Sequence, residues 1–216
     1  MLNLGLAGTG GGLSKVLCLG AHSDDIEIGC GGTLLQLVRS RPDVEVRWVV
    51  FSAEGARSRE AKASAREFLA GTTRAKILTR SFRNAFFPFQ GAAIKEHFEE
   101  LKAEFEPDLV FTHYRDDRHQ DHRTLSDLTW NTFRNHLILE YEIPKYDGDL
   151  GTPNIFVPLD TEVCQEKVRL LAKHFRTQSN KHWFTEDLFL GLMRLRGVEC
   201  GARYAEGFFG RKVVLQ

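Results

Sequence analysis

Short apolar runs alternate with longer amphipathic segments along the first half of the chain. The apolar runs cover residues 15–21, 44–52, 75–82 and 108–114, and each has the length of one strand. Segments with the helical spacing of apolar residues lie between them, around 30–40, 57–70 and 91–105. Strands that alternate with helices in this way predict βαβ units and a mostly parallel sheet.

The pattern changes after residue 137. Residues 137–159 are rich in aromatic side chains, proline and glycine, which favours short strands and loops beside a pocket. Two helices are expected at about 160–176 and 182–196, and a last strand at "KVVLQ", residues 212–216. We expect residues 1–216 to form a single domain, with residues 1–14 as a flexible leader.

Composition narrows the classes of function. The 29 basic and 29 acidic side chains balance, so no overall field attracts nucleic acid. No apolar run is long enough for a membrane span, and the N-terminus has no signal-peptide pattern. The four cysteines include no CxxC pair, which favours a reducing cytoplasm. Whether the chain is a monomer or a homo-oligomer is left open.

The first candidate for chemistry is "GAHSDDIEIGCGG", residues 20–32, directly after an apolar strand. Adjacent carboxylates at the end of a buried strand are costly to desolvate unless a cation neutralises one of them. The spacing of His22 and Asp25 lets an imidazole and a carboxylate converge on a metal ion, which leaves Asp24 to handle a proton. The glycines are expected to let the following helix start close to the strand.

The second candidate is "HYRDDRHQDHR", residues 113–123, also directly after a strand. With His22 and Asp25, a histidine of this cluster completes the three protein ligands of a catalytic zinc site, and His122 is the best placed. His119 is then available to stabilise an oxyanion or deliver a proton, and Asp121 to orient an imidazole. His113 is expected only to line the pocket.

Each cluster alone is equally compatible with a surface histidine or a solvated ion-pair loop. Both clusters, however, follow predicted parallel strands, and open parallel sheets bind their ligands at the carboxyl ends of the strands. A metal site at this edge is therefore the favoured interpretation.

Four motifs in this order, "AHSDD", "GCGGTL", "HQDH" and "YAEGF", resemble the PIG-L/LmbE-like family of zinc-dependent N-acetylglucosaminyl de-N-acetylases. The resemblance runs from about residue 15 to the end of the chain. It implies an α/β, Rossmann-like fold whose mostly parallel sheet is flanked by helices, with the site at the carboxyl ends of the strands. It also implies zinc as cofactor and a small-molecule N-acetylated sugar conjugate as substrate.

Carried over to this sequence, the resemblance places the metal ligands on His22, Asp25 and His122. It places the general base on Asp24 and two further catalytic residues on His119 and Asp121. Arg57 and, in "YAEGF", Glu206 are expected to contact substrate. The chain departs from the family's AHPDDE at two positions, because Ser23 replaces the proline and Ile26 the glutamate.

The function expected from these residues is metal-dependent hydrolysis of an N-acetyl group, which releases acetate and a free amine. Zinc lowers the pKa of a bound water, Asp24 takes its proton, and protonated His119 helps to stabilise the oxyanion. Two alternatives stay open at this point. One is an amidase or deacylase that acts on a non-sugar amide of a natural product, and the other is a metal-binding or sugar-binding protein without turnover.

Overall fold

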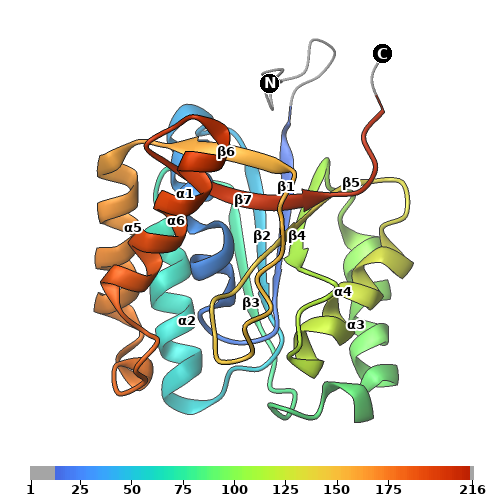
Figure 1. The fold of residues 1–216 in the computed structure, drawn as a ribbon. Coiled ribbons are helices and arrows are strands. Elements are labelled where there is room, and N and C mark those ends of the chain that lie inside the picture. Colours follow the sequence, from blue (N-terminus) through green and yellow to red (C-terminus); the bar gives the residue numbers. More distant parts are fainter. Residues whose placement is uncertain (1–12, 215–216) are drawn as a thin grey trace.

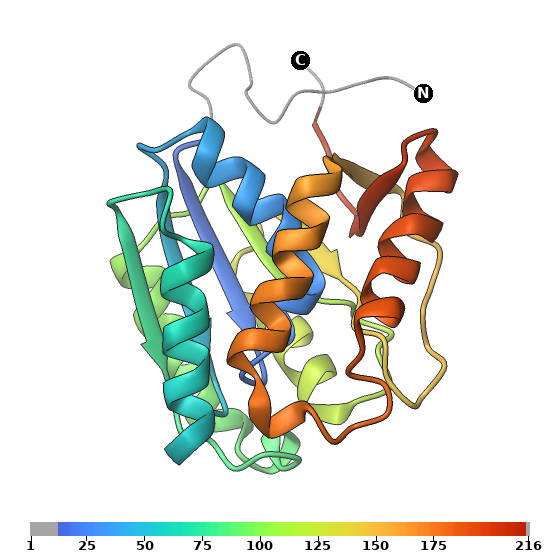
Figure 2. The same ribbon diagram turned by 90° about the vertical axis from the view of Figure 1, so that its left-hand side faces the viewer.

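The computed structural model describes residues 13–214 as one mixed seven-stranded sheet with helices on both faces (Figures 1 and 2). The strands are β1 (Lys15–Gly20), β2 (Glu45–Val50), β3 (Ala75–Thr79), β4 (Leu109–His113), β5 (Leu137–Tyr141), β6 (Ile155–Leu159) and β7 (Tyr204–Gly210). The α-helices are α1 (Asp25–Ser40), α2 (Gly55–Phe68), α3 (Gly91–Glu104), α4 (Gln120–Thr132), α5 (Thr161–His174) and α6 (Glu186–Cys200). A 3₁₀ turn, η1 (Phe87–Phe89), lies between β3 and α3, and a second, η2 (Arg176–Gln178), lies between α5 and α6.

The strand order is β3-β2-β1-β4-β5-β7-β6, and the first five strands of this order are parallel. From β1 the chain moves outward to β2 and β3, and it then returns to the other side of β1 to add β4 and β5. The order therefore reverses between β1 and β4, which is where open α/β sheets form a crevice at the carboxyl ends of the strands. Strand β7 pairs antiparallel with both β5 and β6.

Helices α1, α2, α5 and α6 cover one face of the sheet, and α3 and α4 cover the other (Figure 1). Strand β1 shows how the sequence builds both cores. Val16 and Cys18 belong to the apolar cluster under the first set of helices, whereas Leu17 and Leu19 belong to the cluster under α3 and α4. Because side chains alternate across a strand, a strand covered on both faces needs an unbroken apolar run.

The predicted α/β fold with a mostly parallel sheet is confirmed. Two boundaries were wrong. Helix α1 begins at Asp25 rather than near residue 30, so the glycines lie inside the helix instead of before it. Within the described residues the last strand is β7: Tyr204–Gly210 fills the gap between β5 and β6, whereas Val213 and Val214 of the predicted strand are exposed and have no strand structure, and residues 215–216 lie outside the described residues.

Of the predicted leader, residues 1–12 lie outside the described residues. Ser14 belongs to the fold, because its backbone N–H and hydroxyl both donate to the Asp108 carboxylate, at 2.8 and 2.9 Å. None of the helices within residues 13–214 combines the length and apolar character that a bilayer-spanning helix requires.

Candidate metal centre and active site

Two turns meet at the point where the strand order reverses. The turn after β1 carries His22 and Asp24 and leads into α1, which begins with Asp25, and the turn after β4 ends at His119 and leads into α4, whose first turn carries His122. The structure therefore brings together five of the residues predicted from the sequence, from two parts of the chain about 100 residues apart. All five line one cavity of about 250 Å³.

Three donor atoms converge in this cavity. His22 Nδ1 lies 3.2 Å from His122 Nε2 and 3.4 Å from Asp25 Oδ2, and His122 Nε2 lies 3.6 Å from the same oxygen. Tetrahedral zinc with bonds of about 2.0–2.1 Å places its ligand atoms roughly 3.3 Å apart. The three atoms thus have the spacing and the chemical types of a three-ligand zinc site.

His113 is the other buried histidine at this place. Its Nε2 lies 3.2 Å from Asp25 Oδ2, and with Asp25 and His122 it forms a second group that overlaps the first. That same nitrogen, however, accepts the backbone N–H of Ala21 at 3.0 Å, so its lone pair is already used. The His113 ring stacks on the His122 ring with centroids 3.9 Å apart, so it packs against a candidate ligand.

Carboxylates orient both candidate histidine ligands. His22 Nε2 lies 3.2 Å from Asp121 Oδ2, and His122 Nδ1 lies 2.9 Å from Asp117 Oδ2. A carboxylate on the far nitrogen fixes the tautomer and ring angle of a metal-binding imidazole. Asp121, predicted to be catalytic, is fully buried and does not line the cavity, so its position fits this orienting role.

Sequence reasoning missed Asp117. Its Oδ1 also accepts the backbone N–H of His119 at 2.8 Å, and Lys145 Nζ lies 2.9 Å from its Oδ2. The Asp117 carboxylate thus contacts the His119 backbone, the His122 ring and Lys145, which also lines the cavity. The only signal in the sequence was an acidic pair just before the histidines, and it did not distinguish Asp116 from Asp117.

The pKa values follow from burial and from these neighbours. Burial alone would lower the pKa of His22, but the carboxylates of Asp25 and Asp121 raise it to about 9. Burial and the neighbouring His113 lower the pKa of His122 to about 3. Burial opposes ionisation of Asp25, yet His122, His22 and His113 hold its pKa well below the usual range. Without a metal ion the centre therefore contains an anionic Asp25, a neutral His122 and a protonated His22, and His22 must release a proton when a divalent cation binds.

Asp24 is buried, lines the cavity and makes no capping hydrogen bond to α1. Burial and the adjacent Asp25 carboxylate raise its pKa, which suits a group that accepts and returns a proton near neutral pH. Arg57 also lines the cavity, and its Nη2 lies 3.7 Å from Asp24 Oδ1.

His119 also lines the cavity, and its ring nitrogen lies close enough to those of His22 and His122 for the three to form a further candidate metal group. Its Nδ1 accepts the backbone N–H of Asp121 at 3.2 Å, which leaves Nε2 as the protonated nitrogen of the neutral ring. Burial and the nearby His22 lower the pKa of His119. The Asp121 N–H contact and the lowered pKa favour a neutral His119 imidazole over the charged one that was expected.

Of the aromatic side chains in the later part of the chain, Tyr146 and Trp183 line the cavity, and Lys145 and Lys181 stand beside them. Tyr141 is buried elsewhere, where its hydroxyl donates to the Leu19 carbonyl at 2.6 Å.

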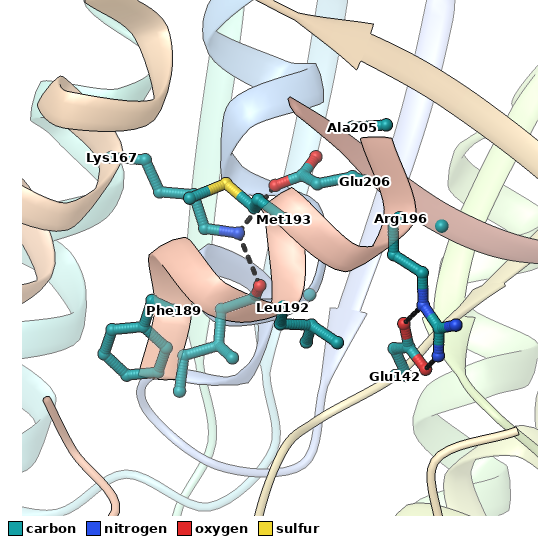
Figure 3. Close-up of a pocket in the computed structure, with 11 residues that line it drawn as sticks. Glu142, Lys167, Phe189, Leu192, Met193, Arg196, Ala205 and Glu206 are labelled. Carbon is teal, nitrogen blue, oxygen red and sulfur yellow. Dashed lines mark hydrogen bonds and ion pairs between the residues drawn. The ribbon is translucent and has the colours of Figure 1, made fainter. Parts of the chain in front are cut away.

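Glu206, predicted to contact substrate, is not in this cavity. It lies behind α1, where it is 4% exposed and pairs with Lys167 at 2.6 Å. The space beside this pair is a separate cavity of about 20 Å³, which has room for one water but not for a sugar (Figure 3). The prediction rested on a motif near the C-terminus, and the motif could not show which face of the sheet the side chain occupies.

The profile of the PIG-L family, described as GlcNAc-PI de-N-acetylase, matches residues 17–133, more than half of the chain. The chain belongs to the PIG-L family. Its matched segment contains both turns of the candidate metal centre and ends before the two later loops that line the cavity, one after β5 and one before α6.

Solved structures extend the likeness of this PIG-L family member over most of its length. N,N'-diacetylchitobiose deacetylase from Pyrococcus horikoshii is 25% identical, with a TM-score of 0.71 over 92% of this chain and 84% of that one. The zinc-inhibited form of teicoplanin deacetylase Orf2 is 14% identical, with a TM-score of 0.70 over 91% and 97%.

The 4-carboxy-2-hydroxymuconate hydratase GalB from Pseudomonas putida is 15% identical, with a TM-score of 0.73 over 94% of this chain and 98% of that one. The same fold thus occurs in a protein named for hydration, so the fold alone does not assign the reaction. The assignment depends on the family and on the side chains of the site.

Proposed function

We propose that this protein hydrolyses the N-acetyl group of an N-acetylglucosamine-type sugar or glycoconjugate, using a divalent metal ion. The observation that carries the proposal is the convergence of His22 Nδ1, His122 Nε2 and Asp25 Oδ2 within 3.2–3.6 Å of one another, beside Asp24 in an open cavity. A separate carboxylate next to a three-ligand metal site is what hydrolysis of an amide requires.

His22, Asp25 and His122 would hold the metal, and we assign it as zinc because two imidazoles and one carboxylate form a ligand set typical of catalytic zinc. When bound, zinc acts as a Lewis acid and makes water acidic enough to supply hydroxide at neutral pH. Asp121 and Asp117 each hold a proton on the far nitrogen of one imidazole, so the metal-facing nitrogen is the one that is free of a proton when the metal binds.

Asp24 moves the proton. It accepts one proton from the attacking water, whose oxygen adds to the acetyl carbon, and it passes this proton to the nitrogen as the carbon–nitrogen bond breaks. Acetate and a free amine result. The raised pKa of Asp24 brings its basicity closer to that of neutral solution, which suits both halves of this transfer.

His119 and Arg57 assist this step. The Nε2–H of neutral His119 donates to the oxygen that becomes negative when water adds to the acetyl group. Arg57 stands 3.7 Å from Asp24 and faces the cavity, where its guanidinium can hold Asp24 and donate to a sugar hydroxyl.

The substrate class follows from the family and from the cavity wall. The relative from Pyrococcus horikoshii is named for diacetylchitobiose and Orf2 for teicoplanin, so the relatives include deacetylases of acetylated sugars and of a glycopeptide. Tyr146 and Trp183 offer aromatic faces at the cavity, against which a sugar ring can pack.

Acetate release from a panel of N-acetyl sugars tests the proposal. The panel contains free N-acetylglucosamine, diacetylchitobiose, a malate glycoside, an inositol glycoside and a nucleotide sugar. We expect release from at least one of them, loss of release with a chelator, and recovery with zinc.

Release that persists in the metal-free protein would contradict the role of the metal. Stoichiometric zinc without release from any sugar would instead favour a non-sugar amide or a binding role, and a panel of N-acyl amines would then distinguish those two.

A further inference from the structure

Helix α1 is broken at Cys30, whose φ of −141° and ψ of 16° are not helical. The short segment before the break, Asp25–Gly29, carries the carboxylate at the metal centre. The longer segment after the break runs away from the site to Ser40. A break in a buried helix leaves N–H and C=O groups that need other partners, since unpaired buried polar groups are costly.

A buried ion pair supplies those partners (Figure 3). Glu206 of β7 accepts the backbone N–H groups of Gly32 and Thr33 at 2.8 and 2.7 Å, and the Thr33 hydroxyl at 2.6 Å. Lys167 of α5 donates to the carbonyl of Ile28 and to Glu206 Oε1, both at 2.6 Å.

These contacts join the two sides of the break. An unbroken α-helix pairs the N–H of residue i with the carbonyl of residue i−4, which here are Gly32 and Ile28. Here the Gly32 N–H donates to the carboxylate of Glu206, and the Ile28 carbonyl accepts from the ammonium of Lys167. The ion pair thus bridges the donor and the acceptor of one helical turn, which is a known way to bend a helix.

Gly32 of α1 leaves room for the Lys167–Glu206 pair because it has no side chain. A Cβ at Gly32 would lie 2.6 Å from Leu159 Cδ1 and 3.0 Å from Glu206 Oε1, so a side chain there would push the carboxylate away. The adjacent cavity of about 20 Å³ is too small for a substrate, and Lys167 and Glu206 are both almost fully buried. The pair therefore acts on the helix and not on a ligand.

We propose that Lys167 and Glu206 are positioning residues for the metal centre, an inference that rests on the metal site of the proposed function. The segment Asp25–Gly29 is fixed at both ends. At its start the backbone N–H of His22 donates to Asp25 Oδ2 at 2.6 Å, and near its end Lys167 holds the Ile28 carbonyl. Ile28 lies three residues from Asp25, about 4.5 Å along the helix axis, so a shift at the break moves the ligand directly.

A purely structural role is the competing explanation, because removing one partner of a buried ion pair destabilises any protein. The double variant Lys167→Met/Glu206→Gln separates the two roles, since it removes both charges together and leaves an amide carbonyl at position 206 that accepts one N–H. We expect its melting temperature to lie closer to wild type than that of either single variant. The Ile28 carbonyl nevertheless loses its ammonium partner in this variant.

Three measurements report on the metal centre itself: zinc affinity, the cobalt(II) spectrum, and kcat with KM. Relative to wild type, we expect the double variant to bind zinc about 10- to 100-fold more weakly in a chelator competition. We expect the visible spectrum of the cobalt(II)-loaded protein to change, because it reports the arrangement of the ligands. With zinc at saturation, kcat should fall while KM stays within about twofold, because the positioned group is a ligand and not a substrate contact.

The matched control is Leu101→Ala in α3, on the opposite face of the sheet. It creates a core cavity and lowers the melting temperature, but we expect the zinc affinity and the cobalt spectrum of wild type. Should the double variant not fold, Thr33→Val serves in its place. This variant removes only the hydroxyl contact to Glu206 and should weaken zinc binding about two- to threefold.

A folded double variant with wild-type zinc affinity and cobalt spectrum would overturn the inference and leave the pair a structural role alone. These two readouts do not depend on turnover. Absence of acetate release by the wild-type protein would therefore count against the proposed function, while the zinc and cobalt comparisons still decide the role of the pair.

Discussion

The two turns that form the metal centre are held by different means. The turn after β1 is fixed by hydrogen bonds from its backbone and by close packing. The His22 N–H donates to the Asp25 carboxylate and the Ala21 N–H donates to the His113 ring. Gly29 of α1 lies against Tyr141. The turn after β4 is fixed by a side-chain charge. The Asp117 carboxylate binds the His122 ring, the His119 backbone N–H and the Lys145 ammonium.

This difference predicts how each turn fails. The first turn should be sensitive to added volume, because a helix packed this closely has no room to move. The second should be sensitive to the loss of one charge, because a single carboxylate orients several groups. Substitutions of each kind, in each turn, test the comparison.

The largest effect is expected from Asp24→Asn in the first turn. This change keeps the shape of the side chain but removes its basicity, so kcat should fall about 10²- to 10⁴-fold. Zinc should remain bound, because Asp24 is not one of the three converging groups. Asp25→Asn is the comparison variant and should lose zinc. Wild-type turnover in Asp24→Asn would show that another group moves the proton.

The next effect is expected from Asp117→Asn in the second turn. The amide keeps the size of the carboxylate but loses the charge shared by His122 and Lys145, so zinc should bind about 10- to 100-fold more weakly. Asp116→Asn is a matched control, because this neighbouring carboxylate is exposed and should leave the zinc affinity unchanged. Chelator competition measures both, and equal affinities would remove the assigned role of Asp117.

Added volume should act on the first turn through Gly29→Ala. A Cβ there would lie 2.2 Å from Tyr141 Cδ2, so the helix or the ring must shift, at a cost of about 1–3 kcal/mol in unfolding free energy. Gly191→Ala in α6 is the control, since nothing lies within 4 Å of its added Cβ, and it should stabilise by up to about 1 kcal/mol. Thermal unfolding distinguishes them, and the same sign for both would contradict the packing argument.

The smallest effect is expected from Ser23→Ala. The Ser23 hydroxyl is buried and has no hydrogen-bond partner within residues 13–214. Its removal should change the unfolding free energy by no more than about 1 kcal/mol, with no loss of stability. A clear fall in melting temperature would show that the hydroxyl, which replaces the proline of the family motif, helps to hold the turn.

The sequence determined the sheet, the place of the site and the residues that converge at the candidate metal centre. Apolar runs that end in "AHSDD" and lead into "HQDH" identify strands and polar turns from neighbouring residues alone, because strand and helix periodicity is local. Parallel strands then force those turns to one edge. His22, Asp25 and His122, which the structure brings within 3.6 Å of one another, could therefore be named in advance.

Only the tertiary structure decided the groups that act through contacts distant in the chain. Asp116 and Asp117 are adjacent and chemically alike, yet Asp117 is buried against His122 and Asp116 is exposed. Glu206 was placed at the substrate by its motif, but it lies behind α1, where it meets Lys167 and the break at Cys30. No local pattern contains this information, because burial and partners are set by which elements pack together.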